Sequence, residues 1–101
     1  MEITHRLNRI LFGWNSQKNL ANYDKHRVEF TTACQAFFDP FLKIVDADSE
    51  SGEVREALIG LTDRWEMLEM LYRVFLEQND AFRIVSARPV TRSERRMYEE
   101  E

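Results

Sequence analysis

The sequence predicts a single α+β domain over residues 1–101, because strand-like and helix-like segments share a chain with room for one core. Of its 101 residues, 44% are hydrophobic and 32% are charged, which fits one modest hydrophobic core. Helix-start signals stand near both ends of the chain, and patterns with a period of two occupy its second half. The apolar runs are short and no leader pattern is visible, so we expect neither a membrane span nor a secretory signal.

The first elements are a short strand and a helix. Residues 9–14 have the composition of a strand, and we expect a helix from there to about His26. Asn15 or Ser16 begins this helix, because either side chain can accept hydrogen bonds from the free N–H groups of a first turn.

A second short helix and a strand follow. The helix over residues 31–38 ends at Asp39, because the residue before Pro40 is pushed out of helical geometry. Residues 41–45 are rich in β-branched and aromatic side chains and predict a strand. The acidic stretch 46–53 is interpreted as a solvated loop.

The next strand is predicted over residues 54–61, where a period of two puts Ala57, Ile59 and Leu61 on one face. Residues 65–77 are ambiguous. Their apolar side chains recur at helical spacing, which slightly favours a helix, although several of them are strand formers. If residues 68–77 form a strand instead, Gln78-Asn79-Asp80 makes a hairpin.

The chain closes with a strand and a helix. Residues 82–90 predict a strand that places Phe82, Ile84, Ser86 and Arg88 on one face. Thr91 and Glu94 form a capping box, in which each side chain satisfies an amide at the start of a helix that runs to about residue 99.

Charge and cysteine content limit the function classes. The net charge of -4 argues against a bulk polyanion binder, but its distribution is uneven: +3 over residues 1–28, -8 over 29–82 and +1 over 83–101. If the two basic segments meet in space, they would suit contact with RNA or phosphate. The simpler interpretation is that these charged residues are scattered over solvated surfaces. The single Cys34 excludes an internal disulfide and fits an inert buried thiol in the cytoplasm. Trp14 and Trp65 are both expected in the core.

Four short motifs in a fixed order carry a family resemblance. They are Phe12-Gly-Trp14-Asn15-x-x-Lys18-Asn19, Asn22-x-x-Lys25-His26-x-Val28, Ile84-Val-Ser86-Ala87-Arg88 and Glu94-Arg95-x-x-Tyr98. Together they resemble the BrnT family over about residues 10–99.

The resemblance implies a ribonuclease toxin of a type II toxin–antitoxin pair with a fold similar to the RelE toxins. It implies an antiparallel sheet of about four strands with two N-terminal helices and one C-terminal helix, and so a strand over residues 68–76. The implied partners are an RNA substrate and a DNA-binding, BrnA-like antitoxin that neutralises the toxin in a hetero-oligomer. We expect no cofactor, no metal ion and no membrane partner.

Four residues depart from the family pattern. Asn15 stands where Asp is usual, a mild change because both side chains cap helix N-termini well. Arg27 stands in the place of a glycine, and positive φ at that position would cost a non-glycine residue roughly 1 kcal/mol. Pro89 removes a backbone donor at the end of its strand. Arg73 stands where a core residue is expected.

RNA cleavage without a metal ion starts when a 2′-hydroxyl attacks the neighbouring phosphate. One group must take that proton, another must protonate the 5′-oxygen, and cations must neutralise the phosphorane. A histidine is the side chain best suited to exchange a proton in neutral solution, so His26 is the candidate for proton transfer. Lys25 is a neighbouring cation, and the Arg88 guanidinium can hold two phosphate oxygens. We therefore predict Lys25, His26 and Arg88 as the catalytic residues.

The predicted substrate-binding residues are basic or aromatic side chains around that set. They are Lys18, Arg55, Arg92, Arg95 and Tyr98. Lys18, Asn22 and Lys25 recur at i, i+4 and i+7 and predict one polar stripe on the first helix.

Each of these assignments has a structural alternative. His26 could cap helix carbonyls, Arg88 could pair with Glu94, and Tyr98 could pack at the core edge. The lysines could be ordinary solvated residues. At the level of the protein, the alternative is a catalytically impaired homologue that only binds an antitoxin as an interaction module or co-repressor, a reading that Arg27, Pro89 and the negative net charge support.

Overall fold

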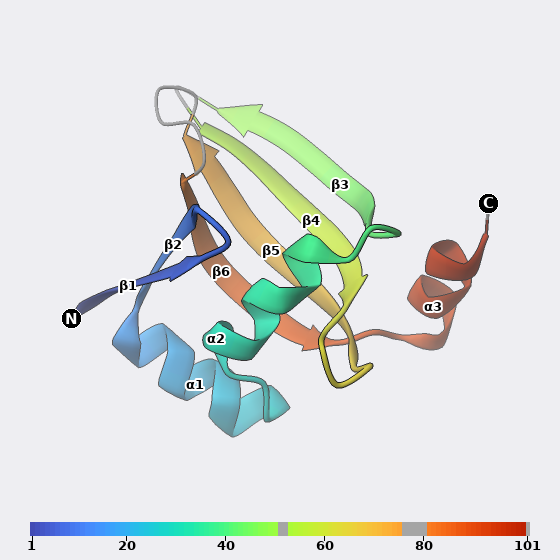
Figure 1. The fold of residues 1–101 in the computed structure, drawn as a ribbon, viewed down its shortest axis with the longest axis horizontal. Coiled ribbons are helices and arrows are strands. Elements are labelled where there is room, and N and C mark those ends of the chain that lie inside the picture. Colours follow the sequence, from blue (N-terminus) through green and yellow to red (C-terminus); the bar gives the residue numbers. More distant parts are fainter. Residues whose placement is uncertain (51–52, 76–80, 101) are drawn as a thin grey trace.

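The computed structural model describes residues 1–50, 53–75 and 81–100. Two strands lead into a helical segment, four strands follow, and a helix ends the chain (Figure 1). The elements are β1 (Glu2–Leu7), β2 (Ile10–Asn15), α1 (Ser16–His26), α2 (Phe30–Ala33), the 3-10 helix η1 (Cys34–Phe38), β3 (Lys43–Glu50), β4 (Glu53–Leu61), β5 (Met67–Phe75), β6 (Ala81–Pro89) and α3 (Arg92–Glu99).

Within the described residues, six strands form one mixed sheet in the order β1-β2-β6-β5-β4-β3. Neighbouring strands are antiparallel except β2 and β6, which pair in parallel through Leu11–Ala81, Phe12–Phe82 and Gly13–Arg83. The α+β class is therefore confirmed, whereas the expected sheet of about four antiparallel strands is wrong. The parallel pair brings an N-terminal strand and the last strand of the chain side by side.

The strand β1 was not predicted from the sequence. This strand forms a hairpin with β2 through a two-residue turn in which both residues have positive φ, 49° at Asn8 and 72° at Arg9. Two positive φ values are typical of a type I′ turn, whose twist matches that of paired strands. Two features of the sequence point to this hairpin. Asn8 tolerates positive φ, and Ile3, His5 and Leu7 alternate along β1 on the side that faces the core.

The helix α1 begins and ends as expected. The Asn15 side chain accepts hydrogen bonds from the backbone N–H groups of Gln17 and Lys18, at 2.9 and 3.3 Å. At the other end Arg27 has φ 59° and ψ 29°, the left-handed conformation, and its N–H donates to the Tyr23 carbonyl. The predicted strain at Arg27 is therefore present in the structure.

The predicted second helix is divided into α2 and η1, and Asp39 leaves helical geometry with ψ 120°. The 3-10 helix packs very closely on β4 at Gly60. A Cβ atom added to Gly60 would lie 2.5 Å from the carbonyl oxygen of Ala36, so only glycine fits there without a shift.

The acidic stretch 46–53 is not a loop, as was expected. The backbone of β3 continues to Glu50, and β4 starts at Glu53 and pairs with it. The loop prediction was wrong because acidic composition describes solvation, whereas β3 is an edge strand that keeps one side in water.

The ambiguous segment 65–77 contains a strand. β5 confirms the strand implied by the family resemblance over 68–76 and overturns the local helical periodicity, because its pairing with both β4 and β6 outweighs local preference. Trp65 is not a core residue: it is 81% exposed and has φ 64°, whereas Trp14 is buried as expected. The predicted hairpin at Gln78-Asn79-Asp80 lies outside the described residues.

The sheet has two unlike faces. The helix face carries the core residues Leu58, Met70 and Ile84, which pack with Phe30 of α2. A register shift opposite Leu71 and Tyr72 makes Val85 an extra residue in β6. Ala87 therefore returns to the helix face, and the expectation that Ile84 and Arg88 share a face is wrong.

The opposite face, called here the far face, carries Ile59, Glu69 and Arg88 directly opposite one another on β4, β5 and β6. Figure 1 shows α1 and α2 together in front of the sheet and α3 apart from them. Glu94 of α3 is bound by Arg88 of the far face, whereas Tyr98 of α3 donates to Asp39 between η1 and β3. The helix α3 is thus attached at the far face, apart from α1 and α2.

Among the described residues, no helix has the length and apolar character needed to cross a bilayer.

Candidate functional site

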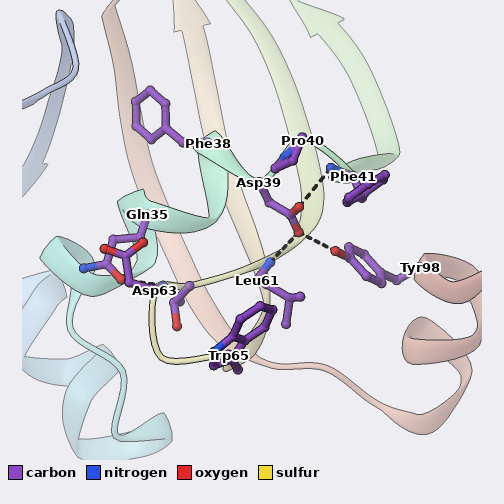
Figure 2. A pocket seen from close by; sticks show the side chains of 10 residues that line it. Gln35, Phe38, Asp39, Pro40, Phe41, Leu61, Asp63, Trp65 and Tyr98 are labelled. Carbon is purple, nitrogen blue, oxygen red and sulfur yellow. Dashed lines mark hydrogen bonds between the residues drawn. The ribbon is translucent and has the colours of Figure 1, made fainter.

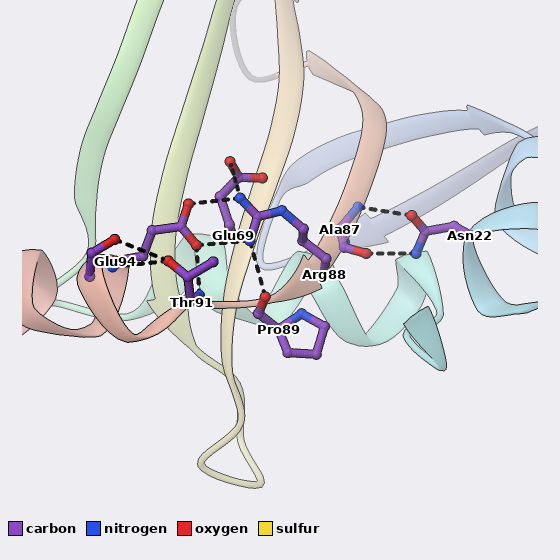
Figure 3. Close-up of polar contacts among 8 residues, drawn as sticks. Asn22, Glu69, Ala87, Arg88, Pro89, Thr91 and Glu94 are labelled. Atoms are coloured by element: carbon purple, nitrogen blue, oxygen red, sulfur yellow. Dashed lines mark hydrogen bonds and ion pairs between the residues drawn. The ribbon is translucent and has the colours of Figure 1, made fainter. Parts of the chain in front are cut away.

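The helix α1 is attached to β6 by a buried asparagine. The Asn22 side chain donates to the carbonyl oxygens of Val28 and Ala87, at 2.9 and 2.8 Å, and accepts from the Ala87 N–H at 3.1 Å. Beyond the short β2 pairing this edge of β6 has no strand partner in the described residues, and Asn22 satisfies its backbone instead (Figure 3). The bonds fix α1 beside the residue that precedes Arg88.

Only part of the predicted polar stripe on α1 is exposed to solvent. Asn22 is 8% exposed and turned inward, while Lys18 and Lys25, four residues before and three after it, are exposed. The stripe prediction was wrong for Asn22, because helical spacing alone cannot show which side chain enters the core. His26, at the last position of the helix, is half-buried.

Arg88 is held by two carboxylates on the far face. Its guanidinium donates to Glu94 at 2.7 and 2.8 Å in a two-pronged arrangement and to Glu69 at 3.3 Å. The hydrogen bonds with Glu94 and the nearby Glu69 carboxylate raise the pKa of Arg88 further. The structural alternative for Arg88, pairing with Glu94, is therefore present in this structure.

The same contacts turn Arg88 away from α1. Figure 3 shows the guanidinium pointing toward Glu94 and α3, with Asn22 and α1 on the other side. The structure therefore brings the backbone of β6 next to α1 but points the Arg88 side chain away from the helix that carries Lys25 and His26.

The helix α3 is anchored at both ends. Thr91 and Glu94 form the predicted capping box, which is confirmed by the bonds from the Glu94 N–H to the Thr91 hydroxyl and from the Thr91 N–H to the Glu94 carboxylate. At its other end the Lys43 ammonium donates to the carbonyl oxygens of Met97 and Glu100. The hydrogen bond from Arg88 is the largest cause that lowers the pKa of Glu94 to about 2.

Tyr98, one turn after Glu94, belongs to a different place. Its hydroxyl donates to Asp39 at 2.5 Å, and Asp39 also accepts from the N–H groups of Phe41 and Leu61 (Figure 2). Burial would raise the pKa of Asp39, but these hydrogen bonds outweigh it and hold the pKa below its usual value. Burial and Asp39 together raise the pKa of Tyr98 to about 12.

These residues line a pocket of about 510 Å³. Its wall also includes Trp65 and Phe41, which are 81% and 73% exposed. Asp39 and Asp63 are its charged lining residues. Tyr98 thus stands in an aromatic and acidic pocket whose lining does not include Arg88.

The remaining predicted residues are dispersed. Arg92 and Arg95 are exposed on α3, and Arg55 is exposed on β4. Arg55 is nevertheless part of a group that the sequence analysis missed: the strand register puts Arg73 of β5 opposite it and Arg83 of β6 next in line. Only the pairing of strands reveals this group, since the three arginines are far apart in the sequence.

The cysteine thiol and the possible metal-binding groups lie outside the candidate catalytic set. Cys34 is fully buried, and burial raises the pKa of its thiol to about 12, as expected of an inert thiol. Within residues 1–50, 53–75 and 81–100, no three His, Cys, Asp or Glu side chains are grouped so that they could hold a metal ion.

Comparison with known proteins decides the family. Residues 14–94 match the family model described as the ribonuclease toxin, BrnT, of a type II toxin–antitoxin system. The chain belongs to the BrnT family. The matched span contains most of the BrnT-like motifs predicted from the sequence, including Lys25, His26 and Arg88.

A solved BrnT structure shares the fold. The crystal structure of the Brucella abortus ribonuclease toxin BrnT, at 1.1 Å resolution, superimposes with a TM-score of 0.55 over 78% of this chain and 94% of that chain. The sequence identity is 15%, so the likeness supports the BrnT fold and no residue correspondence. A search of curated proteins found no match.

Proposed function

We propose that this chain is an endoribonuclease toxin that cleaves RNA without a metal ion in the cytoplasm and is neutralised by a DNA-binding, BrnA-like antitoxin. The observation that carries the proposal is the BrnT family match over residues 14–94, which spans the candidate Lys25, His26 and Arg88. The Asn22 anchor adds support, because it ties the helix that bears Lys25 and His26 to the strand that bears Arg88.

In the proposed reaction, His26 takes the proton of the attacking 2′-hydroxyl as the new oxygen–phosphorus bond forms. The bond to the 5′-oxygen breaks, and a water molecule gives a proton to the leaving oxygen while the hydroxide left behind takes the proton from His26. Lys25 lies next to His26 in the sequence and stabilises the charge on the phosphorane. The products are a 2′,3′-cyclic phosphate and a 5′-hydroxyl.

Arg88 joins this reaction only if a phosphate replaces one of its carboxylate partners and the guanidinium turns from α3 back toward α1. Its side chain is 31% exposed and that of Glu94 17%, so water and substrate can reach the pair. A phosphate offers the guanidinium the same two-oxygen geometry as Glu94. We therefore propose that RNA competes with Glu94 for Arg88, while Lys18, Arg55, Arg92, Arg95 and Tyr98 supply further substrate contacts.

The direct test is an RNA cleavage assay in the presence of a chelator. Purified protein incubated with total RNA is expected to degrade it, and expression without the neighbouring antitoxin gene is expected to stop growth. A matched variant, Asp24→Asn, changes an exposed residue of the same helix and is expected to remain active. Intact RNA together with normal growth would contradict the proposal.

The interaction module remains the second candidate, because the Arg88 guanidinium is already bound by Glu69 and Glu94. On this alternative the chain binds its antitoxin and does not cut RNA. Tight complex formation by a protein whose expression leaves growth normal would select it over the ribonuclease.

A further inference from the structure

The pocket beside α3 is bordered by two aromatic rings that face water. Trp65 reaches it from the turn between β4 and β5, and Phe41 reaches it from the segment between η1 and β3 (Figure 2). Their side chains are 81% and 73% exposed. A single exposed apolar side chain is ordinary, but two aromatic rings on the wall of one cavity are typical of a binding surface.

The backbone of Trp65 is strained where it presents this ring. Its φ of 64° lies in the left-handed region, which is unfavourable for a bulky side chain and which glycine adopts freely. The turn is built on the buried Thr62, whose hydroxyl accepts from the N–H groups of Arg64 and Glu66 and whose carbonyl accepts from the Trp65 N–H. Since the strained backbone and the exposed ring both lower stability, a ligand explains this tryptophan better than packing does.

The pocket is negatively charged. Asp39 and Asp63 are its charged lining residues, and neither takes part in an ion pair between described residues. Burial would raise the pKa of Asp39, but hydrogen bonds from Tyr98 and two backbone N–H groups hold it below its usual value, so this carboxylate is charged in neutral solution. The nearest cations along the chain, Lys43 and Arg64, do not line the pocket, and the Lys43 ammonium is bound to carbonyl oxygens of α3. The pocket therefore favours a cation over a phosphate group.

We propose that this pocket docks a partner protein through one arginine side chain, which lies on the Trp65 ring and donates to Asp63, while apolar neighbours of that arginine pack on Phe41. A planar guanidinium combines stacking on an aromatic ring with several hydrogen bonds to a carboxylate. The volume of about 510 Å³ lies within the roughly 300–1,000 Å³ of pockets that enclose a small ligand, so it has room for more than one side chain.

The inference goes beyond the proposed function and does not depend on it. Of the described residues that line the pocket, only Tyr98 belongs to the proposed RNA-contacting set, and the docking uses Trp65 and Asp63 instead.

The first test is a titration with a short peptide that carries one arginine between two leucines. The control peptide has citrulline in that place, which resembles arginine in shape but has no charge. The chain has two tryptophans and therefore two indole N–H signals in its NMR spectrum, of which that of the buried Trp14 is the internal reference. The arginine peptide should shift the Trp65 signal and leave the Trp14 signal in place. The citrulline peptide should bind at least tenfold more weakly.

The second test uses variants and the fluorescence anisotropy of the labelled arginine peptide. Trp65→Gly should bind at least tenfold more weakly and yet melt no lower than the wild type, because glycine accepts a φ of 64° without strain. A clearly lower melting temperature would show that Trp65 serves packing and would overturn the proposal. Asp63→Asn should weaken binding at least fivefold. Its matched control, Asp24→Asn, makes the same change at an exposed position of α1 and should bind as the wild type does.

Several results would overturn the docking of an arginine. These are an unshifted Trp65 signal, equal binding of the arginine and citrulline peptides, and equal binding by wild type and Trp65→Gly. Free arginine amide that binds as tightly as the peptide would make the pocket a small-molecule site. A 2′-O-methylated RNA that shifts the Trp65 signal in place of the peptide would make it a base-binding site. None of these measurements involves cleavage, so the docking and the ribonuclease can fail separately.

Discussion

At the scale of single residues, Asn22 connects the candidate catalytic helix to the sheet. It is a buried amide that makes three hydrogen bonds, two of them to the backbone of Ala87. Ala87 precedes Arg88, so one side chain determines where Lys25 and His26 lie relative to β6. Its helical position looked like part of a polar stripe, and only the packing of α1 on β6 shows that it is internal.

Asn22→Ala is expected to lower the free energy of unfolding by about 2–4 kcal/mol, because it leaves buried backbone groups of Ala87 and Val28 without partners. Urea denaturation followed by circular dichroism measures this. Gln17→Ala, an exposed change on the same helix, should stay within about 0.5 kcal/mol of wild type. Equal losses in the two variants would show that the Asn22 bonds are not structural.

Arg27 stores strain that glycine would relieve. The residue has φ 59°, a conformation that costs a non-glycine residue roughly 1–2 kcal/mol. Since glycine also gains chain entropy when unfolded, Arg27→Gly should raise the free energy of unfolding by about 0.5–1 kcal/mol. Ala21→Gly, at an exposed position inside the helix, is the control and should lower it by about 1 kcal/mol. Destabilisation of similar size in both would contradict the assignment.

At the scale of elements, the close contact between η1 and β4 depends on Gly60. Gly60→Ala should destabilise the protein by about 1–3 kcal/mol, because the new Cβ meets the Ala36 carbonyl and the backbones must separate. Gly13→Ala is the matched change on another strand, where the nearest atom is 3.4 Å away, at the end of the Glu2 side chain. In thermal unfolding, the melting temperature of Gly13→Ala should stay near that of the wild type. A similar drop in the melting temperature of both variants would contradict the steric explanation.

The attachment of α3 should depend on pH. The pKa of Glu94 is about 2 in the folded protein and near 4.5 when unfolded, so the unfolded state binds the proton more readily. The stability that this carboxylate contributes is therefore complete above about pH 4.5 and is lost as the pH falls toward 2. After allowance for solvent screening we expect about 1–2 kcal/mol.

The measurement is the difference in unfolding free energy between wild type and Glu94→Gln from pH 6 to pH 2. It should shrink as the pH falls, because only the wild type loses this ion pair. A difference that stays constant over this range would show that the Arg88 pair does not hold α3.

The elements predicted from the sequence were those with local signals. The caps at Asn15 and Thr91 and the break at Asp39 lie within a few residues of the structure they determine, and each is confirmed. The edge strands β1 and β3 were missed or shortened, because pairing between strands does not depend on local composition alone. The strand β5 was recovered through the family resemblance and not through its periodicity.

At the scale of the whole molecule, the sequence also could not show which face each candidate side chain occupies. The bulge at Val85 separates Arg88 from Ile84, and the strand register assembles Arg55, Arg73 and Arg83 from three strands. The roles of Lys25 and His26 are predictions from the sequence motif and the chemistry of RNA cleavage. The family comes from the comparison with known proteins, and the structure gives the fold and the ion pairs of Arg88.

The chemistry proposed for Lys25 and His26 makes the end groups of the cleaved RNA the most direct measurement. Purified protein, with chelator present, should convert a short single-stranded RNA into products with a 2′,3′-cyclic phosphate and a 5′-hydroxyl, identified by mass spectrometry. His26→Gln should cut at least 100-fold more slowly with an unchanged melting temperature. Products with a 3′-hydroxyl and a 5′-phosphate, or undiminished cutting by His26→Gln, would contradict the account.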